Sequence, residues 1–123
     1  ILYALSQAEG KGTEIIFLNV QPNYNTPYVK RFISPEEVRK IQEEASQEVF
    51  KHSLELTKNS SLPIITVLRT GDPGREICKF AQESAVDAIV MGYRGLGAVK
   101  RAIFGSVANH VLHEAPCPIT VIP

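Results

Sequence analysis

A glycine-rich stretch from Met91 to Ser106, MGYRGLGAVKRAIFGS, constrains this chain more than any other segment. It follows a short apolar run over residues 86–91, which is typical of a parallel strand buried on both faces. It leads into residues 106–114, where apolar positions recur on one side, as in a helix that packs on a sheet. We expect Ser106 to be the N-cap of this helix.

The chemistry of the stretch is that of a phosphate-binding loop. A helix N-terminus offers unpaired backbone N–H groups and the positive end of the helix dipole. Glycines let the backbone approach a ligand without a Cβ atom in the way, and the stretch has four of them: Gly92, Gly95, Gly97 and Gly105. Between Ala88 and His113 there is no acidic residue and there are three basic ones, Arg94, Lys100 and Arg101. The sequence therefore predicts an anion site here.

Simpler interpretations of these residues stay open. The glycines alone would also serve a tight turn, and Ser106 would then only cap a helix. Arg94 either contacts phosphate or is a solvated loop residue, and Tyr93 either stacks on a base or is an exposed aromatic.

Composition limits the function classes. At 123 residues and 44% hydrophobic, residues 1–123 have the size of a single domain. Thirteen basic and thirteen acidic residues give no net charge, which argues against nucleic acid or an anionic membrane as the main partner. Cys78 and Cys117 form neither a metal-type spacing nor a disulfide framework, and no apolar run reaches the ~20 residues of a membrane span. We therefore expect a cytoplasmic protein without a membrane segment.

Strand and helix patterns alternate along the chain. Strand patterns lie at residues 14–20, 63–68, 86–91 and 116–123, and helical patterns lie between them. This order predicts a doubly wound parallel α/β sheet, which binds its ligands at the C-terminal ends of the strands.

The helix after the first strand has clear start signals. Ser34 is the expected N-cap, Pro35 the first helical residue and Glu37 the partner that closes a capping box. An inward face is predicted at Val38, Ile41, Ala45, Val49 and Leu56, and the helix is expected to end near residues 59–61. The preceding residues 21–33 show no periodicity, and we expect a long loop that is either a lid over the site or a variable surface excursion.

The spacing of the glycines then becomes specific. Gly92, two residues, Gly95, nine residues and Gly105-Ser106 match G-x2-G-x9-G-[S/T], and the chain resembles the ATP-binding branch of the universal stress protein family. The resemblance extends over the chain, through LNV at residues 18–20, GDP at 71–73, VMG at 90–92 and the closing CPITVIP.

This resemblance implies a Rossmann-like fold of the adenine nucleotide alpha hydrolase type, with strand order 3-2-1-4-5 and ATP, with Mg²⁺, as ligand. Val20 would meet adenine through its backbone and Met91 would line the pocket. The triphosphate and ribose would be surrounded by Gly92, Gly95, Gly105, Ser106 and Val107, with Arg94 as a phosphate contact. The last strands of two subunits, Ile119 to Ile122, would pair in a homodimer, which agrees with an apolar strand that leaves a sheet edge open.

The chain departs from the family pattern at its beginning. Ile1 is no translation start, Met91 is the sole methionine, and residues 1–9 read as the tail of a helix. Family members open with a strand and an acidic nucleotide contact, so we expect an incomplete sequence without its central strand. The strands that end at Val20 and Met91 should therefore not be hydrogen-bonded neighbours.

The leading functional interpretation is a nucleotide-binding regulatory module with slow hydrolysis at most. An ATPase that uses Asp72, or an interaction domain that does not bind nucleotide, are the alternatives. Asp72 is more simply a helix cap, with Pro73 at the first helical position. His110, His113 and Cys117 imitate a metal site, but no fourth ligand accompanies them.

Overall fold

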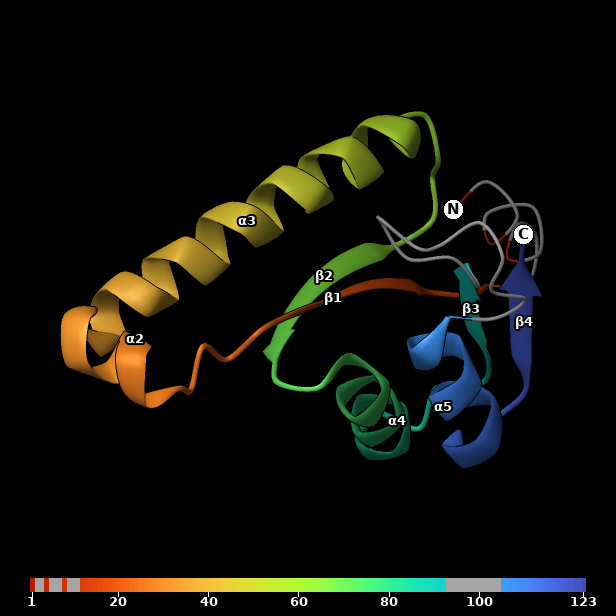
Figure 1. Cartoon of the computed structure of the whole chain (residues 1–123). Coiled ribbons are helices and arrows are strands. Elements are labelled where there is room, and N and C mark those ends of the chain that lie inside the picture. Colours follow the sequence, from red (N-terminus) through yellow and green to blue (C-terminus); the bar gives the residue numbers. More distant parts are fainter. Residues whose placement is uncertain (2–3, 5–7, 9–11, 93–104) are drawn as a thin grey trace. The chain divides into compact units, whose positions relative to one another are not determined.

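The computed structural model describes residues 1, 4, 8, 12–92 and 105–123, and the chain divides into two compact units, Ile1–Gly71 and Asp72–Pro123 (Figure 1). Each unit is described by itself. Both contain a pair of parallel strands joined through a helix, which is the elementary unit of a doubly wound sheet.

The first unit contains strands β1 (Ile15–Gln21) and β2 (Ile64–Thr70) and helices α2 (Pro27–Phe32) and α3 (Pro35–Leu56). The strands pair in register from Ile15 opposite Ile64 to Gln21 opposite Thr70. The Gly71 N–H extends this ladder by donating to the Gln21 carbonyl at 2.9 Å. Its φ of +131° favours glycine, which gives a backbone reason for the glycine of the GDP sequence at residues 71–73.

Helix α3 begins as predicted. The Ser34 hydroxyl accepts the Glu37 N–H at 3.1 Å, and Pro35 is the first helical residue. The Glu37 carboxylate accepts a hydrogen bond from the Ser34 hydroxyl at 3.1 Å, whereas a capping box would use the Ser34 backbone N–H. The helix ends at Leu56 with Thr57 as C-cap, a few residues before the predicted end.

The predicted inward face of α3 is wrong at three of its five residues, whereas Val38 and Ala45 are half-buried. Ile41, Val49 and Leu56 are 44%, 40% and 44% exposed. Small or hydrogen-bonded polar residues are buried in their place: Gln42, Ser46, Ser53 and Thr57. The Gln42 amide donates to the Pro22 carbonyl at 2.8 Å, and the hydroxyls of Ser53 and Thr57 donate to carbonyls one turn earlier. These bonds satisfy polar groups that pattern reading assigns to solvent.

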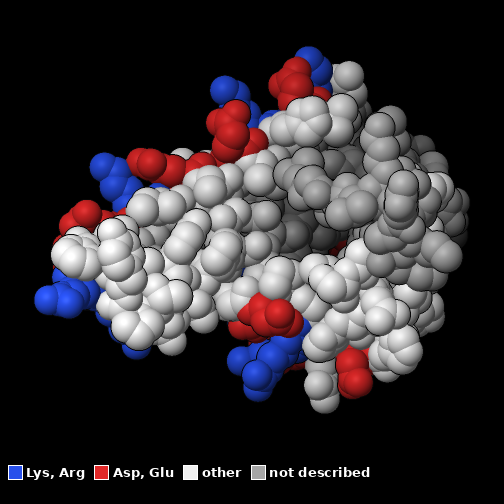
Figure 2. Space-filling view, in the orientation of Figure 1, with Lys and Arg blue, Asp and Glu red and all other residues white. Residues whose placement is uncertain are grey.

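Residues 21–33 are not the featureless loop that we expected, because they contain α2. The Thr26 hydroxyl caps this helix by accepting the Val29 N–H, and Pro27 opens it. Charged residues cover the outer side of α3 with both signs interspersed, in agreement with a solvated face (Figure 2).

The second unit contains α4 (Pro73–Glu83), β3 (Ile89–Gly92), α5 (Ser106–Glu114) and β4 (Ile119–Ile122). The strands pair in parallel from Ile89 opposite Ile119 to Gly92 opposite Ile122. Both are shorter than the predicted runs 86–91 and 116–123. Helices α4 and α5 pack together, and their buried residues are Gly74, Phe80, Ala81, Ala108 and Val111.

The order 3-2-1-4-5 counts a first strand that we expect to be missing from this sequence, so its strands 2, 3, 4 and 5 correspond to β1, β2, β3 and β4. The pairings it implies, 3 with 2 and 4 with 5, are the two that the structure has. Among the described residues β1 pairs with β2 and β3 pairs with β4. No helix in the described part of the chain is both long and apolar enough to span a bilayer.

Candidate functional site

The structure describes only the two ends of the glycine-rich stretch, residues 91–92 and residues 105–106. Strand β3 ends at Gly92, directly after Met91, which is half-buried. Helix α5 begins at Ser106. The predicted contacts Arg94 and Gly95 lie outside the described residues, as do Tyr93, Gly97, Lys100 and Arg101.

Among the described residues, no side chain caps the N-terminus of α5. Gly105 is the N-cap, with φ −67° and ψ 162°, so the prediction that Ser106 is the cap is wrong by one position. The Asn109 N–H makes the first helical hydrogen bond, to the Gly105 carbonyl at 3.0 Å. The N–H groups of Ser106, Val107 and Ala108 therefore precede the hydrogen-bonded part of the helix.

This helix start differs from the other three that the structure describes in full. Helices α2, α3 and α4 are capped by the side chains of Thr26, Ser34 and Asp72, and each has proline at its first position. Gly105 has an ordinary negative φ, so its backbone does not require glycine. What glycine provides there is the absence of a side chain of its own at the positive end of the helix, the end that attracts anions.

Val20 belongs to the first unit, where it is half-buried and lies opposite Arg69 in the ladder. It is the penultimate residue of β1, and Met91 is the penultimate residue of β3. Both residues thus lie at the C-terminal ends of parallel strands, the edge at which α/β folds bind ligands.

Asp72 is a helix cap, as the simpler interpretation predicted. Its Oδ2 accepts the Arg75 N–H at 3.0 Å at the start of α4. A carboxylate near a helix N-terminus also stabilises the helix dipole.

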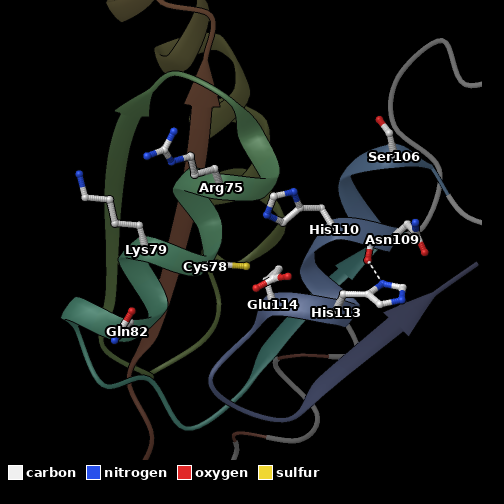
Figure 3. Close-up of a pocket in the computed structure, with 9 residues that line it drawn as sticks. All are labelled: Arg75, Cys78, Lys79, Gln82, Ser106, Asn109, His110, His113 and Glu114. Atoms are coloured by element: carbon white, nitrogen blue, oxygen red, sulfur yellow. Dashed lines mark hydrogen bonds between the residues drawn. The ribbon is translucent and has the colours of Figure 1, made fainter.

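A groove of about 920 Å³ lies between α4 and α5 (Figure 3). Gly74 and His110 bring the helices together, because a Cβ built on Gly74 would lie 2.8 Å from both Cβ and Cγ of His110. Side chains of both helices line the groove, among them Arg75, Lys79, Ser106 and Asn109. Figure 3 shows Arg75 and Lys79 leaving the same side of α4 one turn apart, while Cys78 and His110 point between the helices.

The charged residues that line the groove are distributed unevenly along its length. Arg75 lies near the N-terminal end of α4 and Glu114 at the C-terminal end of α5. Within the described residues, no carboxylate lies within ion-pairing distance of Arg75 or Lys79. Asp72 and Glu76 flank Arg75 in the sequence, so both signs of charge are present at the start of α4.

The two cysteines are free and half-buried. Burial raises the pKa of the Cys78 thiol, and the negative charge of Glu114 and the Cys117 thiol raise it further. Burial and then Asp87 raise the pKa of Cys117. Both thiols are thus neutral near pH 7, and neither has the thiolate character of a nucleophile.

The metal-like pattern on α5 has another explanation. The His113 Nδ1 lies 2.8 Å from the Asn109 carbonyl oxygen, one helical turn away. Among the residues that the structure describes, no group of three or more histidines, cysteines and carboxylates is arranged to hold a metal ion.

Sequence reasoning missed the groove. Its signal was a glycine inside the first turn of α4, Gly74, followed by basic residues at 75 and 79, which share one side of a helix. The partner of that glycine, His110, lies 36 residues further along the chain and could not be identified without the packing of α5.

A model of the universal stress protein family matches residues 1–123. The chain therefore belongs to the universal stress protein family. A universal stress protein of Methanothermobacter thermautotrophicus is 33% identical over an alignment of 132 residues, which covers 99% of this chain and 84% of that protein. The universal stress protein MJ0531 of Methanocaldococcus jannaschii is 33% identical over 85 residues, which is 69% of this chain and 50% of that protein.

Solved structures show the same fold. The universal stress protein UspA from Lactobacillus plantarum has a TM-score of 0.81 at 24% identity and covers 99% of this chain and 86% of its own. A universal stress protein family protein from Arabidopsis thaliana with AMP bound has a TM-score of 0.63 at 22% identity. The match covers 98% of this chain and 76% of that one. A universal stress protein from Archaeoglobus fulgidus in complex with dAMP has a TM-score of 0.57 at 21% identity. The match covers 98% of this chain and 82% of that one. The fold is thus the Rossmann-like α/β class predicted from the sequence.

Proposed function

We propose that this chain is an ATP-binding regulatory module of the universal stress protein family. The observation that carries the proposal is the open N-terminus of α5, where Gly105 leaves three backbone N–H groups without a side-chain cap directly after the glycine-rich stretch. Such a helix start binds phosphate oxygens well. The AMP and dAMP bound by the two structural relatives support an adenine nucleotide as the ligand class.

The contacts follow the positions that match the family motif. Gly92, Gly95, Gly105, Ser106 and Val107 surround the phosphates and ribose, and Arg94 contacts a phosphate. Val20 meets adenine through its backbone, and Met91 lines the pocket.

Mg²⁺ fits this site as a companion of the phosphates. The described residues offer no cluster of carboxylates to hold the ion, and magnesium commonly uses nucleotide phosphates, water and a few protein oxygens. The Ser106 hydroxyl, at the first position of α5, would join them as a protein oxygen. The ion would neutralise phosphate charge.

Binding, with slow hydrolysis at most, is the activity that these residues support. The role that the structure shows for the Asp72 carboxylate is to cap α4, where its Oδ2 accepts the Arg75 N–H. In the cytoplasm, the nucleotide would bias the conformation of the chain and of a homodimer formed through β4.

Nucleotide released from the purified protein tests the proposal. The protein is denatured, and the supernatant is analysed by HPLC for ATP, ADP and AMP. We expect an adenine nucleotide to be released, and Mg-ATP to raise the melting temperature of the nucleotide-free protein. Absence of both effects would refute nucleotide binding.

A further inference from the structure

Three hydrogen bonds hold the C-terminal end of β1. From the end of β2, the Gly71 N–H donates to the Gln21 carbonyl at 2.9 Å. From α3, the Gln42 side-chain amide donates to the Pro22 carbonyl at 2.8 Å. Within β1, the Gln21 side-chain amide donates to the Asn19 side-chain oxygen at 2.8 Å. The end of this strand is thus held by a neighbouring strand, by a helix and by its own side chains.

The direction of the ladder bonds decides where the Val20 backbone faces. In a parallel ladder, successive residues turn their backbone groups to opposite sides. At one end of the ladder the Ile15 N–H donates to the Pro63 carbonyl at 2.9 Å, and at the other the Gln21 carbonyl accepts the Gly71 N–H. Ile15 and Gln21 therefore face β2. Val20, one position before Gln21, turns its N–H and carbonyl to the other edge of the strand.

Gln42 holds this strand end from a buried position. Gln42 is 8% exposed, whereas Pro22 and the three residues that follow it are exposed. Breaking the bond would leave a buried amide without this partner, which costs free energy, whereas the exposed carbonyl can bind water instead. The bond therefore anchors an exposed segment to the packed side of α3.

We propose that Gln42 is a positioning residue for the base: its bond to the Pro22 carbonyl holds the end of β1 so that the Val20 N–H and carbonyl are ready for adenine. This inference rests on the proposed function and adds a residue that does not touch the nucleotide. A strand end that is ordered before binding pays less conformational entropy when the base arrives.

The pattern of donors and acceptors makes this effect specific to the base. Adenine offers a donor at N6 beside an acceptor at N1, which match a backbone carbonyl and N–H. Guanine offers an acceptor at O6 and a donor at N1, which do not match them in the same orientation. Loosening the end of β1 should therefore weaken adenine recognition more than guanine binding.

Calorimetric titration of the full chain with Mg-ATP and with Mg-GTP tests the inference. In Gln42→Met, which keeps the size of the side chain and removes the donor, we expect ATP affinity to fall about fivefold, the equivalent of one hydrogen bond. GTP affinity should change less than about twofold, because guanine does not use the Val20 groups in this way. Gln42→Asn, whose amide is one methylene shorter, should lower ATP affinity in the same direction. The matched control is Gln47→Met at an exposed position of α3, which should change neither affinity.

The outcomes separate this inference from the proposed function. If the wild-type chain binds ATP and Gln42→Met keeps the wild-type ratio of ATP to GTP affinity, Gln42 does not position the base contact, and nucleotide binding stands. Wild-type protein that binds ATP and GTP equally tightly would also overturn the inference alone. If the wild-type chain does not bind ATP, both proposals fall. An equal loss of ATP affinity in Gln47→Met would show a general effect of the substitution and overturn the assignment. Circular dichroism of each variant verifies its fold.

Discussion

At the scale of single residues, Gly74 and His110 make a close contact between the two helices of the second unit. A glycine in a helix is normally a cost of about 1 kcal/mol relative to alanine. Here the missing Cβ is what lets α4 and α5 approach each other, because the nearest atoms of His110 would lie 2.8 Å from it. The sequence shows the glycine but not its partner.

Gly74→Ala should therefore destabilise the protein, although it improves helix propensity. Overpacking typically costs about 1–3 kcal/mol. We expect a net loss of about 1 kcal/mol, measured as the free energy of unfolding in urea. Gln82→Ala, at an exposed position of the same helix, is the control and should stay within about 0.5 kcal/mol of wild type. A Gly74→Ala protein as stable as this control would contradict the packing described here.

The two cysteines give a prediction about pH. The pKa of each thiol is raised in the folded state, mainly by burial. A group whose pKa is higher when folded than when unfolded contributes stability below its unfolded pKa, and this contribution is lost as the pH rises through the folded value. Stability should therefore decline in the alkaline range above the ordinary thiol pKa.

The rate of alkylation by iodoacetamide measures these pKa values directly. We expect the pH midpoint for Cys78 and for Cys117 in the native protein to lie above that of the urea-unfolded chain. The single variants Cys78→Ser and Cys117→Ser assign each midpoint. A native midpoint at or below the unfolded one would show that the thiols are activated instead.

At the scale of the elements, helix starts were easier to predict than helix faces. The sequence predicts the N-caps Ser34 and Asp72 because each is followed by a proline, and the structure confirms both. Helix α2 has the same signature in Thr26-Pro27, but with 6 residues it is too short to show periodicity. At α5 the serine was predicted to be the N-cap, whereas Ser106 is the first helical residue and Gly105 is the N-cap.

The buried face of α3 could not be predicted from hydrophobic spacing. The polar groups of Gln42, Ser53 and Thr57 find hydrogen-bond acceptors in the folded chain, and this offsets the cost of burying them. Ser46 differs, since its buried hydroxyl has no partner among the described residues. Its small size is the feature that fits a buried position.

Gly105→Ser tests whether the open start of α5 is a ligand site. A serine hydroxyl there can bond the free N–H groups, so the stability of the ligand-free protein should rise by a few tenths of a kcal/mol. The same hydroxyl competes with phosphate, and ATP affinity should fall about tenfold, the loss of roughly one charged hydrogen bond. Ser34→Gly, which removes the cap of α3, should lower stability slightly and leave ATP affinity unchanged. Equal ATP affinity in Gly105→Ser and wild type would argue against this site.

At the scale of the whole molecule, the proposed homodimer depends on one edge of β4. In a parallel ladder, successive residues turn their backbone groups to opposite sides. The Ile89 N–H donates to the Pro118 carbonyl at 3.0 Å, so Thr120 directs its N–H to β3 and Val121 directs its N–H to the open edge.

Val121→Pro should therefore produce a monomer with little change in the melting temperature of the chain. Proline is tolerated on an edge strand when its missing N–H faces outward. Thr120→Pro is the matched variant, since it removes an N–H from the β3–β4 ladder and should lower the melting temperature. Light scattering coupled to size exclusion gives the mass of each variant. A Val121→Pro protein that remains a dimer would place the interface elsewhere.

The alternating strand and helix patterns predicted the fold class, because these patterns are local signals, whereas the strand neighbours were implied by the family resemblance. The sequence predicted the candidate site less completely, because the described part of that site depends on which residue begins α5 and how closely α4 packs against it. Neither is visible in a glycine motif.

Titration of the nucleotide-free chain with Mg-ATP tests the central claim most directly. The account predicts saturable binding in the wild-type protein that is lost in Gly105→Val, in which a branched side chain fills the start of α5. Wild-type protein that releases no heat and shows no thermal shift, or Gly105→Val protein that binds Mg-ATP as tightly as wild type, would contradict it.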